Sequence, residues 1–271
     1  MLYIVPTPIG NLEDITLRAL RILQEADIIA AEDTRKTLTL LNHFGIKKPL
    51  ISYYEHNKRS KGEVLLAKLR EGQNIALVSD AGSPGICDPG ADLIKEALAE
   101  GLEITVLPGA CAATTALIAS GLDTTKFVFE GFIPREKSPR RKFLKELASE
   151  SRTMIFYETP HRISESLKAV YEAFGERQIA LCRELTKKFE EINRGALSEI
   201  IAEYEQREPK GEFVLIVSGK VSEETVLPDE EDLLAEMQAL MSKGNSRKQA
   251  SKLLAEKYGI SAKEAYDLSL N

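Results

Sequence analysis

The sequence has few of the residues that build metal sites and disulfide frameworks. Its cysteines and histidines are Cys87, Cys111, Cys182, His43, His56 and His161. An odd, sparse cysteine count without a Cys-x-x-Cys pair argues against a disulfide scaffold and favours a reducing compartment. The histidines are too scattered for the usual spacing of zinc ligands. We therefore expect no metal site.

The sequence also predicts neither a leader nor a membrane anchor. Its N-terminus carries no basic region and its apolar run stops at Pro6, so we expect no signal peptide. The stretch 104–122 is free of charge and is about long enough to span a bilayer. However, it contains Pro108-Gly109 and several Thr and Ser, which favours a strand, a turn and a small-residue helix. We expect a cytoplasmic protein without a membrane segment.

Two common phosphate-binding motifs are missing as well. No G-x-G-x-x-G opens a helix, and G-x-x-x-x-G-K-[ST] does not occur. These motifs cradle the phosphates of dinucleotides and nucleoside triphosphates. A net charge of −6 further argues against indiscriminate binding of nucleic acid.

The chain nevertheless has ample material for packed α/β domains, with 271 residues of which 43% are apolar. In the first half, short apolar runs alternate with helical periodicity, which predicts a mostly parallel sheet. The expected strands are 2–5, 27–32, 50–54, 74–78 and 103–107. In the second half, strands are expected at 126–132, 152–158, 178–185, 189–195 and 212–219. The strands 178–185 and 189–195 are so close in sequence that an antiparallel pair and a mixed sheet are expected.

These patterns predict three parts. An N-terminal α/β domain is expected over 1–121, and a second α/β domain over 122–220. A polar linker and a small helical tail follow over 221–271, where two capping boxes, Ser246-x-x-Gln249 and Ser261-x-x-Glu264, flank a turn at Gly259. The tail has helix-turn-helix proportions, and the alternative is an appendage that only packs.

Four loops follow expected strands of the first half, and three of them are rich in glycine or proline. They are 6–11 (PTPIGN), 32–35 (EDTR), 79–85 (SDAGSPG) and 108–113 (PGACAA). In open α/β sheets ligands bind beyond the carboxyl ends of the strands, so these loops predict a ligand site. Their prolines are stiff, and Asp33 and Asp80 add negative charge, which favours a cationic or zwitterionic nucleoside such as S-adenosylmethionine over a polyphosphate.

Eight motifs, in order from Leu2 to about Gly219, resemble those of the tetrapyrrole methylase superfamily. They are LYIVPTPIGNLEDITLRAL, AEDTR, SDAGSPGICDPG, LPGACAA, FEGFIPR, FYETPHRI, CRELTKKFE and KGEFVLIV. The resemblance is closest to the ribosomal branch, the ribosomal RNA small subunit methyltransferase I family. Other branches usually open with a glycine-rich GxGxG where this chain has PTPIG, and this departure favours the ribosomal branch.

The resemblance implies two α/β domains that hold S-adenosylmethionine between them. It implies methylation of the ribose 2′-hydroxyl of a cytidine in the decoding region of 16S ribosomal RNA, as free RNA or as the 30S subunit, by a homodimer. It also implies the residues that contact the cofactor: Ile9, Asp80, Gly82, Ser83, Cys111, Ala112, Tyr157, Leu185 and Phe213. For Ile9, Leu185 and Phe213 the alternative is plain core packing.

A ribose hydroxyl is a poor nucleophile, so a general base or a charge near the alkoxide is expected. The candidate catalytic residues are Glu32, Asp33, Arg35, Glu158 and His161. Glu32 and Asp33 are the first candidates for the base, and Arg35 is a candidate for gripping a phosphate. Alternatively, Asp33 and Arg35 pair with each other and brace their loop.

Basic clusters are the candidates for RNA contact. The expected RNA-binding residues are Arg135, Lys137, Arg140, Arg141 and Lys142 in one stretch, and Arg247 and Lys248 in the tail. Each cluster is alternatively a solvated face. Two other functions stay open at this point, a methyltransferase for corrin or porphyrin precursors and a non-catalytic RNA-binding factor in ribosome assembly.

Overall fold

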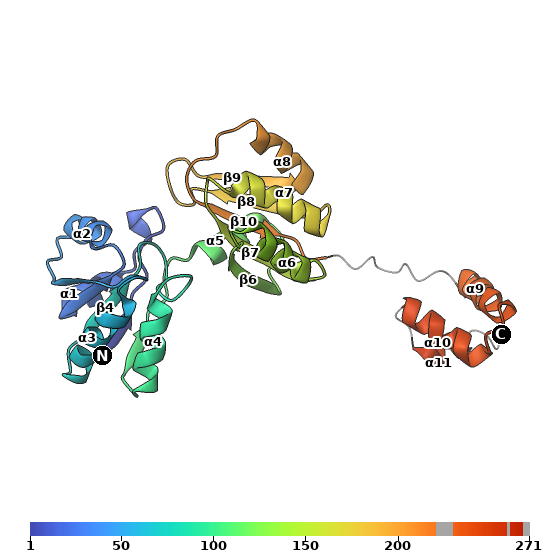
Figure 1. Cartoon of the computed structure of the whole chain (residues 1–271), viewed down its shortest axis with the longest axis horizontal. Coiled ribbons are helices and arrows are strands. Elements are labelled where there is room, and N and C mark those ends of the chain that lie inside the picture. The colour runs from blue at the N-terminus through green and yellow to red at the C-terminus, as the bar shows by residue number, and fades with distance from the viewer. Residues whose placement is uncertain (221–229, 259–260, 268–271) are drawn as a thin grey trace. The chain divides into compact units, whose positions relative to one another are not determined.

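The computed structural model describes residues 1–220, 230–258 and 261–267. It divides into two compact units, Met1–Gly219 and Lys220–Asn271. The first unit holds two five-stranded sheets, and the second is helical (Figure 1). Two α/β domains followed by C-terminal helices confirm the fold class expected from the sequence.

The first sheet is entirely parallel, with the order β3-β2-β4-β1-β5. Its strands are β1 (Leu2–Ile4), β2 (Ile28–Ala31), β3 (Leu50–Ser52), β4 (Ile75–Val78) and β5 (Ile104–Val106). Its helical segments are η1 (Leu12–Asp14), α1 (Leu17–Glu25), α2 (Thr34–His43), α3 (Lys58–Arg70) and α4 (Gly90–Ala99). The helix α5 (Ala112–Ser120) follows β5.

Both faces of this sheet are covered. Leu23 of α1 and Leu41 of α2 belong to a core cluster on one face, and Leu66 of α3 and Leu93 of α4 belong to a cluster on the other. Strands covered on both sides are expected to be continuously apolar, and every residue of β2 and β4 is buried.

The second sheet is mixed, with the order β6-β7-β10-β8-β9. Its strands are β6 (Phe127–Phe132), β7 (Thr153–Glu158), β8 (Gln178–Arg183), β9 (Glu191–Ala196) and β10 (Phe213–Val217). Only the β6–β7 pair is parallel, and β8–β9 is antiparallel as expected. The helices α6 (Lys137–Leu147), α7 (Ile163–Phe174) and α8 (Leu197–Glu205) cover one face.

Helix α5 covers the other face of the second sheet. Side chains alternate between the two faces of a strand, so Phe156 of β7 packs with α6–α8 while its neighbour Ile155 packs against Ala116 of α5. The domain boundary near 121–125 stays a prediction, and α5, which precedes it, makes its sheet contacts with the second domain.

A buried arginine joins several element ends of the second domain. The guanidinium of Arg177 donates to the carbonyl oxygens of Phe174 (3.4 Å), Ser218 (3.3 Å) and Ala148 (3.0 Å), and burial lowers its pKa. Phe174 ends α7 and Ala148 is the C-cap of α6. A cation is favourable at helix C-termini because their last carbonyls carry partial negative charge.

The helical unit has a small core of its own. Its helices are α9 (Glu230–Ser242), α10 (Arg247–Tyr258) and α11 (Ala262–Asp267), packed around Met237, Ala250, Leu254 and Ala265. Ser246 and Gln249 form the expected capping box, with Ser246 Oγ accepting from Gln249 N and Gln249 Oε1 accepting from Ser246 N. The linker 221–229, the turn at 259–260 and the Glu264 side chain lie outside the described residues.

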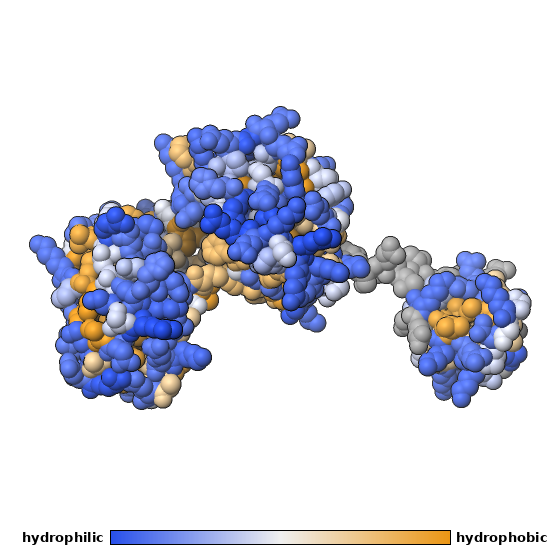
Figure 2. All heavy atoms as spheres, viewed as in Figure 1, coloured by the Kyte–Doolittle hydropathy of each residue, from blue (hydrophilic) through white to orange (hydrophobic). Residues whose placement is uncertain are grey.

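The surface of this unit is mostly hydrophilic, with an apolar patch on the face seen in Figure 2. Arg247 and Lys248 are exposed at the start of α10. Among the helices of the described residues, none combines the length and the apolar composition needed to cross a membrane.

Candidate functional site

The four loops after β1, β2, β4 and β5 hydrogen-bond to one another. The backbone N–H groups of Thr7 and Gly82 each donate to the other residue's carbonyl at 2.9 Å. Asp80 Oδ1 accepts from Asp33 N at 2.9 Å, and the Ser83 hydroxyl donates to a carbonyl of the loop after β5. These strands are neighbours in a parallel sheet, so their carboxyl ends share one edge. The predicted convergence of the loops is therefore observed.

A cavity of about 390 Å³, the main cavity, is lined by these loops and by the second sheet. It is within the size range of small-molecule sites. All nine residues predicted to contact a cofactor line it: Ile9, Asp80, Gly82, Ser83, Cys111, Ala112, Tyr157, Leu185 and Phe213. All three cysteines of the chain, the exposed Cys87, the half-buried Cys111 and the buried Cys182, line it too.

The loop after β4 is held rigidly. Gly82 has a φ of +80°, which favours glycine. Both carboxylate oxygens of Asp88 accept from Gly85 N (2.9 and 3.0 Å), and Oδ1 also accepts from Gly90 N (2.7 Å). Burial raises the pKa of Asp88, although these backbone donors oppose the change. Asp88 thus fixes the C-terminal end of the loop by these hydrogen bonds. Asp80, at the N-terminal end of the loop, lines the main cavity.

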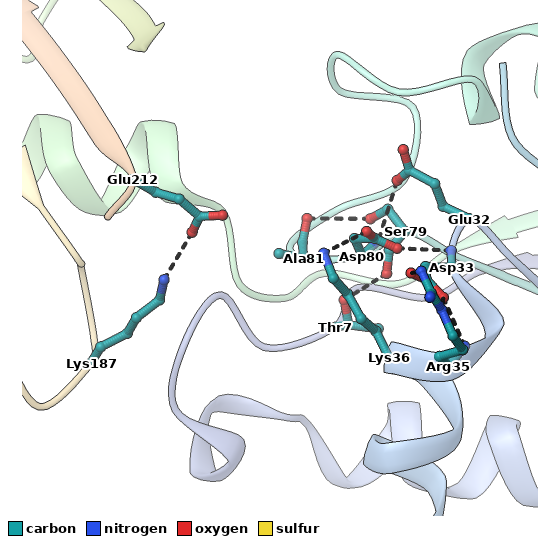
Figure 3. Close-up of polar contacts among 10 residues, drawn as sticks. All are labelled: Thr7, Glu32, Asp33, Arg35, Lys36, Ser79, Asp80, Ala81, Lys187 and Glu212. Carbon is teal, nitrogen blue, oxygen red and sulfur yellow. Dashed lines mark hydrogen bonds and ion pairs between the residues drawn. The ribbon is translucent and has the colours of Figure 1, made fainter. Parts of the chain in front are cut away.

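Three charged residues that line the main cavity, Glu32, Lys36 and Asp80, lie close together (Figure 3). Lys36 Nζ donates to Asp80 Oδ2 at 2.7 Å, and Glu32 Oε2 accepts from Asp80 N at 3.4 Å. Burial, and then the negative charge of Asp80, raise the pKa of Glu32. The hydrogen bond to Asp80 raises the pKa of Lys36. At neutral pH Lys36 is therefore an ammonium, and Glu32 is a better proton acceptor than an ordinary carboxylate. Lys36 was not among the site residues predicted from the sequence.

Asp33 and Arg35 pair with each other, which is the alternative to catalysis that the sequence left open for them. Asp33 Oδ1 accepts from Arg35 N (2.9 Å) and Nε (3.0 Å), and Oδ2 accepts from NH2 (2.7 Å). The hydrogen bonds from Arg35 hold the pKa of Asp33 well below its usual range, which makes it a weak base. Neither residue lines the main cavity. We therefore remove both from the candidate catalytic set, since they brace the start of α2.

Glu158 and His161 are also poorly placed for catalysis. Glu158 lines the main cavity, but its side chain is fully buried. Its oxygens accept from Thr159 N at 2.8 Å and from the Ser166 hydroxyl at 2.6 Å, and Arg162 lies 3.3 Å away. The carboxylate thus holds the start of α7. His161 is exposed in the preceding turn and does not line the main cavity, so neither residue supports the catalytic role expected for it.

The second domain contributes an apolar wall to the main cavity. Leu185 and Phe213 form this wall and are buried, and Ile9 of the first domain is a further buried residue that lines the cavity. Burial of these three side chains is what both the cofactor contact and plain core packing require. Tyr157 accepts a hydrogen bond from Ala113 N at 3.2 Å, and burial raises its pKa. The tyrosine thereby connects β7 to the start of α5.

The loop 184–187 beside this wall is closely fitted. Glu184 and Thr186, which flank Leu185, have positive φ values of 52° and 66°, a strained conformation for these residue types. A Cβ added at Gly10 would lie 2.4 Å from Lys187 Cγ and 2.8 Å from Thr186 Oγ1. The absence of a side chain at Gly10 therefore lets the loop after β1 contact the second domain.

The basic stretch 135–142 is only partly available for RNA. Arg135, Lys137, Arg141 and Lys142 are exposed, on a surface that is mostly hydrophilic over α6 (Figure 2). Arg140 is buried and NH2 pairs with Glu165 Oε1 at 2.5 Å. Arg140 therefore joins α6 to α7, and we remove it from the expected RNA-binding set.

Comparisons with known proteins agree with this geometry. The family model of the tetrapyrrole (corrin/porphyrin) methylases matches residues 1–201. Among solved structures, a uroporphyrin-III-C-methyltransferase from Thermus thermophilus has a TM-score of 0.57 at 22% identity, covering 80% of this chain and 93% of that one. A diphthine synthase has a TM-score of 0.63 at 16% identity, covering 81% and 90%. The fold is thus that of the tetrapyrrole methylases.

Closer relatives narrow this class. Proteins named ribosomal RNA small subunit methyltransferase I are 49% identical in Synechocystis sp., covering 100% of this chain and 97% of the relative, and 47% identical in Bacillus subtilis, covering 98% and 93%. The relative in Thermotoga maritima is 48% identical over 219 residues, which is 81% of this chain but 98% of the relative. The chain belongs to the ribosomal RNA small subunit methyltransferase I family of tetrapyrrole methylases.

Proposed function

We propose that this protein transfers a methyl group from S-adenosylmethionine to the ribose 2′-hydroxyl of a cytidine in the decoding region of 16S ribosomal RNA, in the cytoplasm. The observation that carries the proposal is the 49% identity, over the whole chain, to a relative named for small-subunit ribosomal RNA methylation. The 2′-oxygen and the cytidine come from the resemblance of the eight motifs to that family.

The main cavity fits the cofactor chemically. S-adenosylmethionine supplies an electrophilic methyl group on its sulfonium. Its amino acid part carries an ammonium group, so the cofactor brings two positive charges. Asp80, Glu32 and Asp88 give the cavity negative charge, and Leu185 and Phe213 give it an apolar wall. Among the described lining residues, Lys36 is the only lysine or arginine, and it is paired with Asp80. Such a lining favours a cation over a polyphosphate.

Glu32 and Lys36 are the residues that act on the acceptor. Glu32 accepts the proton of the ribose hydroxyl, since its pKa is raised and its carboxylate faces the main cavity. Lys36 remains charged and stabilises the negative charge that develops on the oxygen. Asp80 holds the ammonium in place at 2.7 Å.

The remaining parts bind RNA and a second copy. Residues 1–121 and 122–220 act as the two halves of the cofactor cleft. The exposed basic residues of 135–142, together with Arg247 and Lys248 of the tail, contact phosphates of the 16S RNA or 30S subunit. The family resemblance further implies a homodimer, for which light scattering would give twice the chain mass of 30.0 kDa.

The test is methyl transfer from radiolabelled S-adenosylmethionine to unmodified 30S subunits and to free 16S RNA, with the product mapped. One 2′-O-methylated cytidine in the decoding region is expected. Asp80→Asn is expected to weaken cofactor binding in calorimetry, whereas Asp14→Asn, an exposed carboxylate away from the main cavity, should leave it unchanged. Label on a base, or no label with cofactor binding intact, would refute the proposed acceptor.

A further inference from the structure

A second cavity adjoins the main cavity within the first domain. It has a volume of about 220 Å³ and is lined by Thr7, Pro8, Leu12, Lys36, Thr37, Thr39, Leu40, His43, Ser79 and Asp80. We call it the α2 cavity, because half of these residues come from α2. Its volume is below the ~300–1,000 Å³ of a typical small-molecule site, so it suits one part of a larger ligand.

The two cavities share one wall. Lys36, Ser79 and Asp80 line both of them, and the ion pair of Lys36 with Asp80, at 2.7 Å, stands at this wall (Figure 3). Ser79 is buried and its carbonyl accepts from the Thr7 hydroxyl at 3.1 Å. A group at this shared wall is therefore next to whatever reacts in the main cavity.

The lining of the α2 cavity has the chemistry of a nucleoside site. Pro8, Leu12 and Leu40 offer apolar surface for a flat ring, and the Thr39 hydroxyl and the His43 imidazole offer polar groups near it. Thr39 donates to Arg35 O at 3.1 Å, so its oxygen remains an acceptor. Proteins that act on single nucleotides take them out of the stack and hold the base against apolar surface with a few hydrogen bonds.

From this arrangement we infer that the α2 cavity is the subsite for the acceptor nucleoside of the RNA. Its base lies between the loop after β1 and α2, and its ribose lies at the shared wall, where Lys36 is charged and Glu32 faces the main cavity. The inference rests on the proposed function, because it takes the acceptor to be a ribonucleoside. It adds a place, wholly within the first domain, where that nucleoside is recognised.

The three histidines provide a direct binding test. His43 lines the α2 cavity, whereas His56 and His161 line neither cavity. In proton NMR of the full chain saturated with S-adenosylhomocysteine, a single-stranded RNA pentamer with a central cytidine is expected to shift the His43 ring resonance more than that of His161. A His43→Gln variant assigns the resonance. An unmoved His43 resonance at saturating RNA would overturn the inference.

Filling the cavity provides the matching kinetic test. Thr39→Met places a larger side chain at an exposed position in the lining, and Asn42→Met places the same side chain at an exposed position of α2 outside it. Thr39→Met is expected to lower kcat/KM for 30S subunits about tenfold or more, with cofactor Kd changed less than about twofold. Asn42→Met should match the wild type. Melting temperatures of both variants identify any loss of folding.

Each result is decisive. If Thr39→Met keeps full kcat/KM, the α2 cavity is not the subsite, and if it weakens cofactor binding instead, the cavity belongs to the cofactor; both overturn the inference. If the wild-type chain does not methylate 16S RNA or 30S subunits at all, the proposed function fails. The NMR titration still decides in that case whether a ribonucleoside binds beside His43.

Discussion

Replacing Glu32 with glutamine is expected to slow methyl transfer while leaving the cofactor bound. Glutamine keeps the shape of the side chain and the hydrogen bond accepted from Asp80 N at 3.4 Å, but it takes up no proton. A general base contributes about 10²–10⁴-fold to a rate. Because Glu32 is only half-buried, we expect the lower part of this range. A loss of about 10²–10³-fold in kcat corresponds to about 3–4 kcal/mol of activation free energy.

The pH dependence separates a base from a merely structural carboxylate. Burial and the charge of Asp80 raise the pKa of Glu32 above its ordinary value of 4.5. Activity therefore falls as the pH drops through this raised pKa, because the protonated carboxyl accepts no proton. Asp80→Asn removes one of the charges that raise it. At saturating cofactor, the acid limb should consequently move to lower pH in Asp80→Asn and disappear in Glu32→Gln.

The assay is single-turnover methyl transfer to 30S subunits across the acid range, with cofactor affinity measured in parallel. Glu25→Gln, a carboxylate exposed at the end of α1, is the matched control and should behave as the wild type. A Glu32→Gln enzyme within threefold of the wild-type rate would refute the role of Glu32. So would an acid limb that Asp80→Asn leaves in place.

Three further predictions concern stability, closure and RNA. Arg177→Met removes a donor from three partly buried carbonyls, at about 2–3 kcal/mol, and should lower the calorimetric Tm by about 4–10 °C. Arg152→Met, in an exposed pair, should change it by less than about 2 °C, and equal shifts would contradict the argument. Gly10→Ala should weaken cofactor binding about tenfold in calorimetry, because its Cβ displaces the adjoining loop of the second domain; unchanged affinity would show that the loop yields freely. Replacing the four exposed basic residues of 135–142 by glutamine, with Arg140 kept, should raise KM for 30S subunits and flatten its salt dependence, and an unchanged slope would exclude this surface.

Much of the fold could be read from the sequence because strand patterning is local. Every strand expected from the sequence is present in the described residues, with ends that differ by at most two residues. The site followed from one topological rule, since the loops after neighbouring parallel strands must meet at one edge. That rule brings Ile9, Asp80 and Cys111 to the same cavity although they are far apart in the chain.

The roles predicted for Arg35 and Arg140 failed because a short motif does not show which side of a helix faces the cavity or the core. Successive residues of a helix point about 100° apart, so only one of Arg35 and Lys36 is able to face the cavity. Because α2 begins at Thr34 with Asp33 as its cap, Arg35 folds back on Asp33 and Lys36 reaches Asp80. In α6, Arg140 is four residues before the buried Leu144 and shares its face. That spacing was visible in the sequence and marks Arg140 as an inward-facing residue.

All three cysteines line the main cavity, so their reaction with a thiol reagent reports whether a ligand occupies that cavity. A thiol reagent has no other cysteine to modify, so the rate of labelling reports on this one cavity without any engineered residue. Burial raises the pKa of Cys182 to about 11, and burial with the nearby Asp88 raises that of Cys87, so labelling of these two thiols should be slow near neutrality and faster in alkaline buffer. A bound ligand shields the sulfurs, so protection of the purified chain from labelling measures the affinity of that ligand without a calorimeter.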